Sequence, residues 1–147
     1  MCQAICFHKD QFSREVLKKA KLGVINDQVK VYFTHQYAVL PVLYWGNPRL
    51  IRWGNKRHPQ LPRSYFCKME SYDAGKWNWL QPLPLTILAS AALVNGIWFQ
   101  IRQGIQGLVV QDQAGFQYCY ILTQVSTHYF KTMTGAGRMP VLINQIL

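Results

Sequence analysis

Apolar residues follow a helical spacing near the start of the chain and a strand-like spacing after it. Residues 12–21 place their apolar side chains on one helical face: Phe12, Val16, Leu17 and Ala20. Ser13 is a typical N-cap residue and Gly23 a typical stop, so we expect a helix between them. From Val29 onwards, apolar and polar residues alternate, which is typical of a half-buried strand.

Short β-rich runs occupy much of the remaining chain. They cover residues 29–34, 39–45, 49–53, 105–110 and 116–123. Gly46-Asn47-Pro48 separates two of these runs and residues 111–115 separate another two, so each pair is expected to form a hairpin. A second helix is expected over residues 126–133, followed by a Gly-containing loop and a return to the sheet over residues 139–143. These patterns predict one α+β domain, residues 1–147, with a mainly antiparallel β-sheet and a few short helices.

The composition indicates a folded domain with an anionic partner. The chain has 147 residues, enough for one hydrophobic core, and 50% of them are hydrophobic. This content argues against an intrinsically disordered chain. The 16 Lys and Arg residues outnumber the 6 Asp and Glu residues, which gives a net charge of +10. Such a charge favours a polyanion, either nucleic acid or an anionic membrane face.

Membrane insertion is not expected. The longest uncharged stretch runs from Trp77 to Ile101, but its continuous apolar part, Leu83 to Val94, is too short for a membrane-spanning helix, which needs about 20 residues. The first residues carry charges and lack the apolar block of a secretory signal. We therefore expect a cytoplasmic protein with free thiols. Its cysteines are Cys2, Cys6, Cys67 and Cys119.

A basic segment carries the main binding signal. It runs from Arg49 to Lys68 and contains no acidic residue. Its cations are Arg49, Arg52, Lys56, Arg57, Arg63 and Lys68, and its interleaved aromatic residues are Trp53, Tyr65 and Phe66. Phosphates attract cations and unstacked bases stack on aromatic rings, so this composition favours single-stranded nucleic acid. The alternative is that Trp53 and Phe66 belong to the core and that the charges form a solvated rim.

Cys2 offers a second kind of chemistry. It follows the initiator methionine, and a small second residue normally allows that methionine to be removed. Removal would leave an α-amine and a thiol on one carbon skeleton, and this 1,2-aminothiol can condense with an aldehyde to give a thiazolidine. Both groups are partly deprotonated at neutral pH. The alternative is a cysteine at this position that has no function.

Other site chemistries find little support in the sequence. Cys2, Cys6 and His8 are close together, but they lack the second ligand pair of a structural zinc site. The segment Gly104-Ile105-Gln106-Gly107 lacks the Lys-Ser/Thr of a phosphate-binding loop. We therefore expect neither a metal nor a cofactor.

Five segments, in order along the chain, carry a family resemblance. They are Met1-Cys2, Arg52-Trp53-Gly54, Cys67-Lys68-Met69-Glu70, Gly96-Ile97-Trp98-Phe99 and Arg138-Met139-Pro140-Val141-Leu142-Ile143. Their order and spacing resemble the SOS response-associated peptidase (SRAP) family, whose members crosslink to abasic sites in single-stranded DNA through an N-terminal cysteine. The resemblance implies a barrel-like SRAP fold, Cys2 and Glu70 as catalytic-site residues, and Arg138 as a further DNA contact.

Three positions depart from the family pattern. The family's Asn before the Ala-Arg-X-Glu segment falls on Phe66, its acid/base Glu on Phe99 and its His on Ala136. Proton transfer by a positioned side chain contributes typically about 10²–10⁴-fold. The loss of these groups therefore predicts a slower reaction rather than none.

Glu70 and His128 are the remaining candidates for proton transfer. Glu70 could instead pair with Arg52, Arg63 or Lys68, and His128 could be an exposed helix residue. The sequence thus predicts a monomeric, SRAP-like protein that binds single-stranded DNA and links covalently to abasic-site aldehydes through Cys2. Two alternatives stay open: a nucleic-acid-binding relic without this chemistry, and a cysteine peptidase that acts on proteins.

Overall fold

Strands dominate the structure. The computed structural model describes residues 2–147, which form eleven strands, three α-helices and two short 3₁₀ helices. The strands are β1 (Cys2–His8), β2 (Gln28–Tyr32), β3 (Val39–Tyr44), β4 (Asn47–Trp53), β5 (Phe66–Lys68), β6 (Leu83–Ile87), β7 (Ala91–Val94), β8 (Ile97–Gln100), β9 (Ile105–Gln111), β10 (Gln117–Val125) and β11 (Arg138–Pro140). The helices are η1 (Lys9–Gln11), α1 (Arg14–Lys19), α2 (Met69–Asp73), η2 (Asn78–Leu80) and α3 (His128–Thr134). The predicted α+β class, with a mainly antiparallel sheet and short helices, is confirmed.

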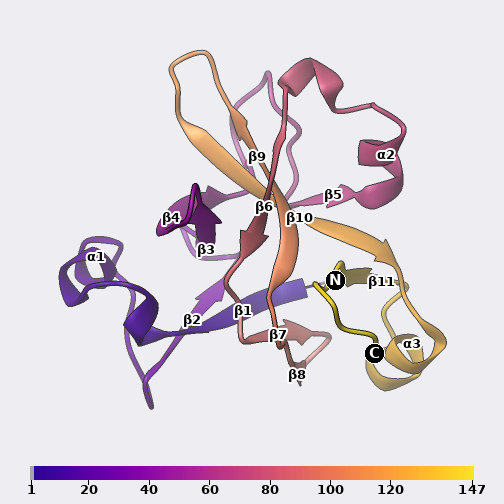
Figure 1. Cartoon of the computed structure of the whole chain (residues 1–147), viewed down its shortest axis with the longest axis horizontal. Coiled ribbons are helices and arrows are strands. Elements are labelled where there is room, and N and C mark those ends of the chain that lie inside the picture. The colour runs from indigo at the N-terminus through magenta and orange to yellow at the C-terminus, as the bar shows by residue number, and fades with distance from the viewer. Residues whose placement is uncertain (1) are drawn as a thin grey trace.

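The larger of two sheets closes into a small barrel (Figure 1). Its strands follow the order β11-β10-β4-β3-β6-β9, and β9 also pairs with β10, which closes the ring. Most pairings are antiparallel, but β10 runs parallel to both β4 and β5. The second sheet has the order β2-β1-β7-β8 and is antiparallel throughout.

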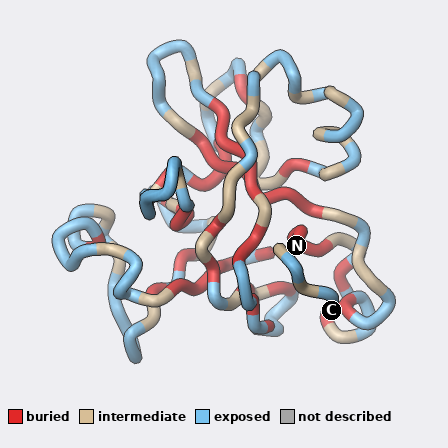
Figure 2. Tube along the Cα trace, viewed as in Figure 1, coloured by how far each residue is buried: buried red, intermediate tan, exposed pale blue. Residues whose placement is uncertain are grey.

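Both sheets contribute to one hydrophobic core. Its members include Ile5 from the four-stranded sheet and Leu40 and Ile121 from the barrel. A smaller cluster contains Tyr120 and Leu122, the neighbours of Ile121 along β10. Because successive side chains of a strand point to opposite faces, β10 is covered on both sides. Figure 2 shows the same pattern, with buried positions concentrated in the strands and exposed positions at the hairpin ends and around α1.

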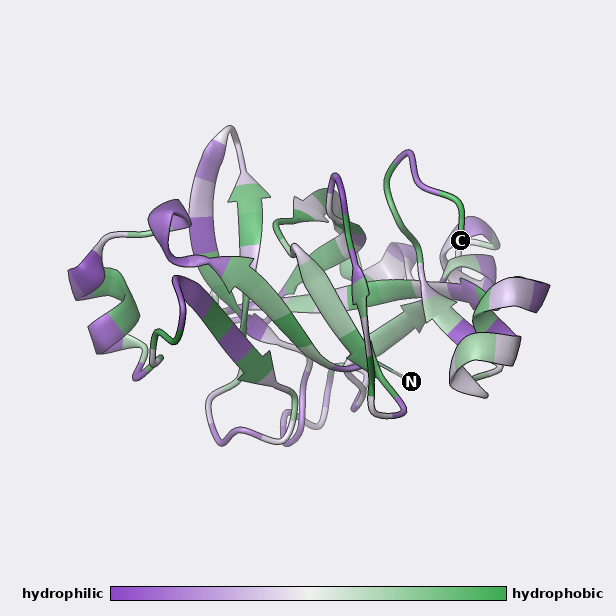
Figure 3. Cartoon of the chain, turned by 90° about the horizontal axis from the view of Figure 1, so that it is seen from below, coloured by the Kyte–Doolittle hydropathy of each residue, from purple (hydrophilic) through white to green (hydrophobic). Residues whose placement is uncertain are grey.

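Hydropathy follows the strand architecture. In Figure 3 the strands are largely green, and many of the loops that connect them are purple. No helix within residues 2–147 is long and apolar enough to cross a membrane.

The first predicted helix is present as α1. Ser13 caps it, because the Val16 N–H donates a hydrogen bond to the Ser13 hydroxyl at 3.2 Å. The helix ends at Lys19, and Lys21 rather than Gly23 takes the left-handed conformation, with a φ of 58°. The Leu22 N–H then closes the end by donating to the Leu17 carbonyl at 3.0 Å.

Both predicted hairpins are confirmed. Strand β3 pairs with β4 and β9 pairs with β10, each in antiparallel register. The first turn is shorter than expected, because Tyr44 pairs with Asn47 and leaves only Trp45 and Gly46 between the strands. These two residues have φ values of 50° and 79°, as in a type I′ turn.

The second predicted helix is confirmed as α3, which begins two residues later than expected, and the return to the sheet is shorter than predicted, since β11 ends at Pro140. The hydroxyl of Thr127 caps α3, and β11 returns to the sheet beside β10. The first strand has no counterpart in the sequence pattern. Strand β1 escapes prediction because nearly all of its residues are buried, so its sequence does not alternate.

Truncation of Ile121 should destabilise the protein strongly. The side chain lies at the centre of β10 and is fully buried. Ile121→Ala should lower the free energy of unfolding by roughly 2–5 kcal/mol, measured by urea denaturation. The control is Val125→Ala on the same strand, where the side chain is 67% exposed and the change should stay within about 0.5 kcal/mol. Equal losses in the two variants would contradict the assignment of β10 as the core strand.

Candidate nucleic-acid interface

Strand β4 and the loop that follows it form one side of an open pocket of about 600 Å³. Three of the predicted DNA-binding cations line this pocket: Arg52, Lys56 and Arg57. The side chain of Tyr37 also lines it and is 62% exposed. The pocket therefore combines positive charge with an accessible aromatic ring, the two features that single-stranded nucleic acid requires.

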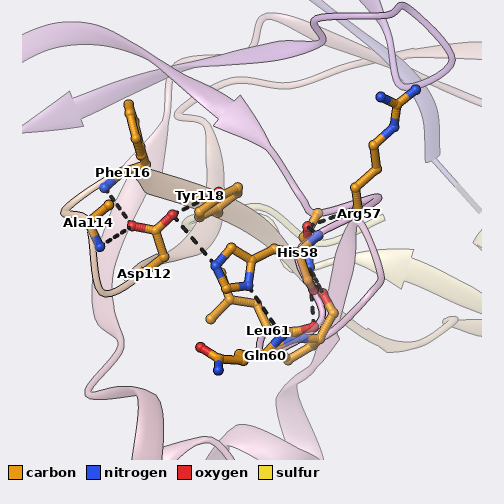
Figure 4. A network of polar contacts seen from close by, with 10 residues as sticks. Arg57, His58, Gln60, Leu61, Asp112, Ala114, Phe116 and Tyr118 are labelled. Carbon is orange, nitrogen blue, oxygen red and sulfur yellow. Dashed lines mark hydrogen bonds and ion pairs between the residues drawn. The ribbon is translucent and has the colours of Figure 1, made fainter.

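The three cations are positioned in different ways. Arg52 lies beside Tyr118 of the parallel strand β10, with its guanidinium carbon 5.4 Å from the centre of the Tyr118 ring. The Lys56 ammonium donates a hydrogen bond to the His35 carbonyl at 3.1 Å. Arg57 extends away from the neighbouring polar network in Figure 4. Within the described chain none of the three forms an ion pair, so their charges are available to a phosphate.

Two residues fix the backbone of the loop after β4. Gly54 has a φ of +63°, and a Cβ there would lie 2.5 Å from the Ser64 carbonyl oxygen, so only glycine fits. The side chain of Asn55 is buried and accepts hydrogen bonds from two backbone N–H groups of the loop. Its amide also donates to the carbonyls of His58, Leu61 and Pro62, at 2.9, 3.2 and 3.4 Å.

A carboxylate with a nearly buried side chain connects the loop to the β9–β10 turn. Asp112 accepts hydrogen bonds from the Tyr118 hydroxyl at 3.1 Å and from the N–H groups of Ala114 and Phe116 (Figure 4). The Nε2 of His58 lies 3.8 Å from Oδ2 of this carboxylate. Burial opposes the charge, but the hydrogen bonds outweigh it and lower the pKa of Asp112. Burial, together with the contact to Asp112, raises the pKa of Tyr118.

Trp53 is a core residue. It is only 2% exposed, and its indole N–H donates a hydrogen bond to the Tyr65 carbonyl at 3.3 Å. Its ring is therefore not available for stacking on a base. For this residue the alternative prediction, that Trp53 belongs to the core, is the correct one. The reason is strand alternation, which turns Arg52 outwards and Trp53 inwards. Tyr37 and Trp45, which precede the basic segment in sequence, are among the exposed aromatic residues of the chain.

The other predicted cations of the basic segment lie outside this pocket. Arg49 is near the tip of the β3–β4 hairpin, Arg63 is exposed on the loop, and Lys68 ends β5. The structure therefore groups three of the predicted cations at the pocket, whose wall also includes the buried Trp53, and it distributes Arg49, Arg63 and Lys68 over the surrounding surface.

Arg138 and Glu70 form a bidentate ion pair. The two guanidinium Nη atoms lie 2.6 and 3.2 Å from the carboxylate oxygens, and Nη2 also donates to the carbonyl and hydroxyl of Thr123. The hydrogen bond from Arg138 lowers the pKa of Glu70. The partner of Glu70 is thus none of the three cations expected from the sequence. The ion pair connects α2 to the barrel. Because its guanidinium is already engaged, Arg138 is less accessible to a phosphate than the pocket cations are.

Cys2 lies in the hydrophobic core at the start of β1. It is 1% exposed, and its thiol donates a hydrogen bond to the Ala4 carbonyl at 3.3 Å. Burial raises the pKa of this thiol to about 12. Phe99 and Ala136, where the predicted family resemblance would place acid/base residues, are buried in the same core, and His128 is exposed at the start of α3. Met1, whose removal the aminothiol chemistry requires, lies outside the described residues.

The chain gave no match in comparisons with protein-family models, with curated proteins or with solved structures. The relation to the SRAP family thus stays a prediction from the motifs. Among the described residues, no group of His, Cys, Asp or Glu side chains could hold a metal ion.

The burial of Cys2 predicts a specific pH dependence. A thiol whose pKa is raised on folding stabilises the protein below its unfolded pKa of about 8.5, and this contribution is lost as the pH rises towards the folded value. We expect Cys2 to resist alkylation by iodoacetamide at pH 8 in the native state and to react in urea. The free energy of unfolding should fall above about pH 9, and it should fall less steeply in Cys2→Ala. Rapid alkylation of native Cys2, located by peptide mass spectrometry, would contradict its burial.

Proposed function

We propose that the protein binds single-stranded DNA, with phosphates held by Arg52, Lys56 and Arg57. The observation that carries this proposal is the pocket after β4, where three cations without acidic partners surround a cavity of about 600 Å³. Tyr37 supplies an exposed ring for a base. The proposal includes a cytoplasmic, monomeric protein, as the sequence predicts.

The accessible ring favours a single strand over a duplex. Bases of a duplex are stacked on one another and hidden from a flat protein side chain, whereas those of a single strand can stack on Tyr37. The rigid loop supports binding as well. Asn55 and Gly54 fix the backbone that carries Lys56 and Arg57, so little backbone freedom is lost when DNA binds.

Removal of a pocket charge should weaken binding to every sequence and reduce its salt dependence. Arg57→Gln is the cleanest variant, because the Arg57 side chain is exposed and forms no ion pair with the residues that the structure describes. For each phosphate that the variant no longer neutralises, the slope of log K against log salt should become less negative by about 0.7, measured by fluorescence anisotropy with labelled dT12.

Lys19→Gln is the matched control, since it removes one exposed positive charge from α1, outside the pocket. It should leave the salt slope almost unchanged. No binding by the wild type, or an equal effect of the two variants, would refute the proposed site.

The second candidate function is covalent capture of abasic sites. One observation favours it: Cys2 belongs to the same core cluster as Ala136 and Met139, the residues close to Arg138 in sequence. In the reaction, the α-amine adds to the aldehyde and water leaves to give an imine. The thiol sulfur then attacks the imine carbon, its proton passes to the nitrogen, and a thiazolidine results.

The position of the thiol determines how this reaction should proceed. Because burial keeps Cys2 neutral, ring closure requires the start of β1 to open, so the reaction should be slow. The same burial makes a peptidase that acts on other proteins the least supported alternative.

The adduct with abasic single-stranded DNA is therefore expected to accumulate slowly and to form faster as the pH is raised. Its formation can be followed on denaturing gels, with protein whose intact mass confirms that Met1 has been removed. Cys2→Ala should form no adduct but should bind DNA as the wild type does. Absence of an adduct at every pH, with normal binding, would leave the non-covalent function alone.

A further inference from the structure

The tip of the β3–β4 hairpin carries an aromatic residue in an unfavourable conformation. Trp45 has a φ of 50° and is 77% exposed. Type I′ turns favour Asn, Asp or Gly at this position, because a bulky side chain is strained in the left-handed region. Trp45 buries little of its surface, so burial does little to offset this strain. A strained residue that stays exposed on the surface is a candidate for a functional role.

The surroundings of Trp45 indicate what it could bind. The Arg49 guanidinium carbon lies 4.9 Å from the centre of the Tyr44 ring, and the Tyr44 ring stands edge-on to Trp45. Gln117 holds Tyr44 in place by donating to its hydroxyl at 3.0 Å. An apolar hollow of about 210 Å³ lies beside Trp45, lined in part by Leu43 and Leu83.

This combination matches the chemistry of a nucleotide. A flat exposed ring can stack on the face of a base, and a neighbouring cation can contact the phosphate next to it. Arg49 forms no ion pair within the described chain, so its charge is free for this contact. A protein partner would also need an apolar surface, but it would not need an unpaired cation beside the ring.

We propose that the hairpin tip is a second subsite for the same DNA strand, where Trp45 stacks on a base and Arg49 contacts a phosphate. This inference rests on the proposed function. Strand β4 carries Arg49 near the tip and Arg52 in the pocket. The two side chains are three residues apart and therefore point to opposite faces, so the DNA would cross the edge of β4, which pairs with β10 only from Arg52 onwards. From Asn47 to Arg52 the strand extends roughly 17 Å, at a rise of about 3.3 Å per residue. At about 3.4 Å per stacked nucleotide, this length corresponds to roughly five nucleotides.

Trp45→Asn is the sharpest test, because Asn suits the left-handed turn position. The variant should be at least as stable as the wild type, yet bind dT12 roughly 5- to 150-fold more weakly. Binding of dT3, which is too short to reach both subsites, should not change. Trp45→Phe keeps an aromatic ring and should retain most of the affinity for dT12.

The controls separate this inference from the proposed function. Tyr129→Ala removes an aromatic ring of similar exposure from α3 and should not affect binding. If Trp45→Asn binds dT12 as tightly as the wild type while Arg57→Gln binds more weakly, the hairpin subsite is refuted and the pocket stands. If the wild type binds neither oligonucleotide, the proposed function itself fails. Equal losses of affinity in Trp45→Phe and Trp45→Asn would refute stacking.

Discussion

The hydrogen bonding of β10 is the constraint on which the rest of the structure depends. This strand pairs with β4, β5, β9 and β11, and it is covered on both faces. Its pairing with β4 places Tyr118 beside Arg52, and Thr123 accepts hydrogen bonds from Arg138. The pocket and the Arg138–Glu70 pair are therefore positioned by the same strand. A shift in its register by one residue would exchange the two faces and disrupt both.

Local features of the fold could be predicted from the sequence, and features that depend on distant contacts could not. The cap at Ser13 and the two hairpins depend on residues that are neighbours in the chain. The Arg138–Glu70 pair joins residues 68 positions apart, so no local pattern reveals it. The basic segment stands out by its charge, but composition does not tell which face of a strand a side chain occupies. For that reason the composition points to the buried Trp53 and not to the exposed Trp45.

The apolar residues at positions 99 and 136 suit the hydrophobic core in which Cys2 is also buried. A carboxylate at position 99 or an imidazole at position 136 would lose its hydration in this core, which is costly without a partner. Phe99 and Ala136 avoid that cost and pack against the core instead. The same apolar surroundings keep the Cys2 thiol neutral. The apolar core around Cys2 therefore opposes rapid attack by its thiol. The same core does not restrict the charged surface around β4.

The two parts of the proposed DNA surface differ in how their residues are held before DNA binds. In the pocket, the side chain of Asn55 satisfies backbone groups of the loop and fixes it, so the backbone that carries Lys56 and Arg57 is ordered before any ligand arrives. At the hairpin tip, Trp45 stays 77% exposed in a strained turn, and its edge-on contact with Tyr44 covers little of the ring. Stacking on a base would add a favourable contact that the exposed ring lacks in the free protein. A DNA strand bound first at the ordered pocket would hold its bases near the hairpin tip at a high effective concentration. Even a modest stacking energy at Trp45 would then extend the complex along β4.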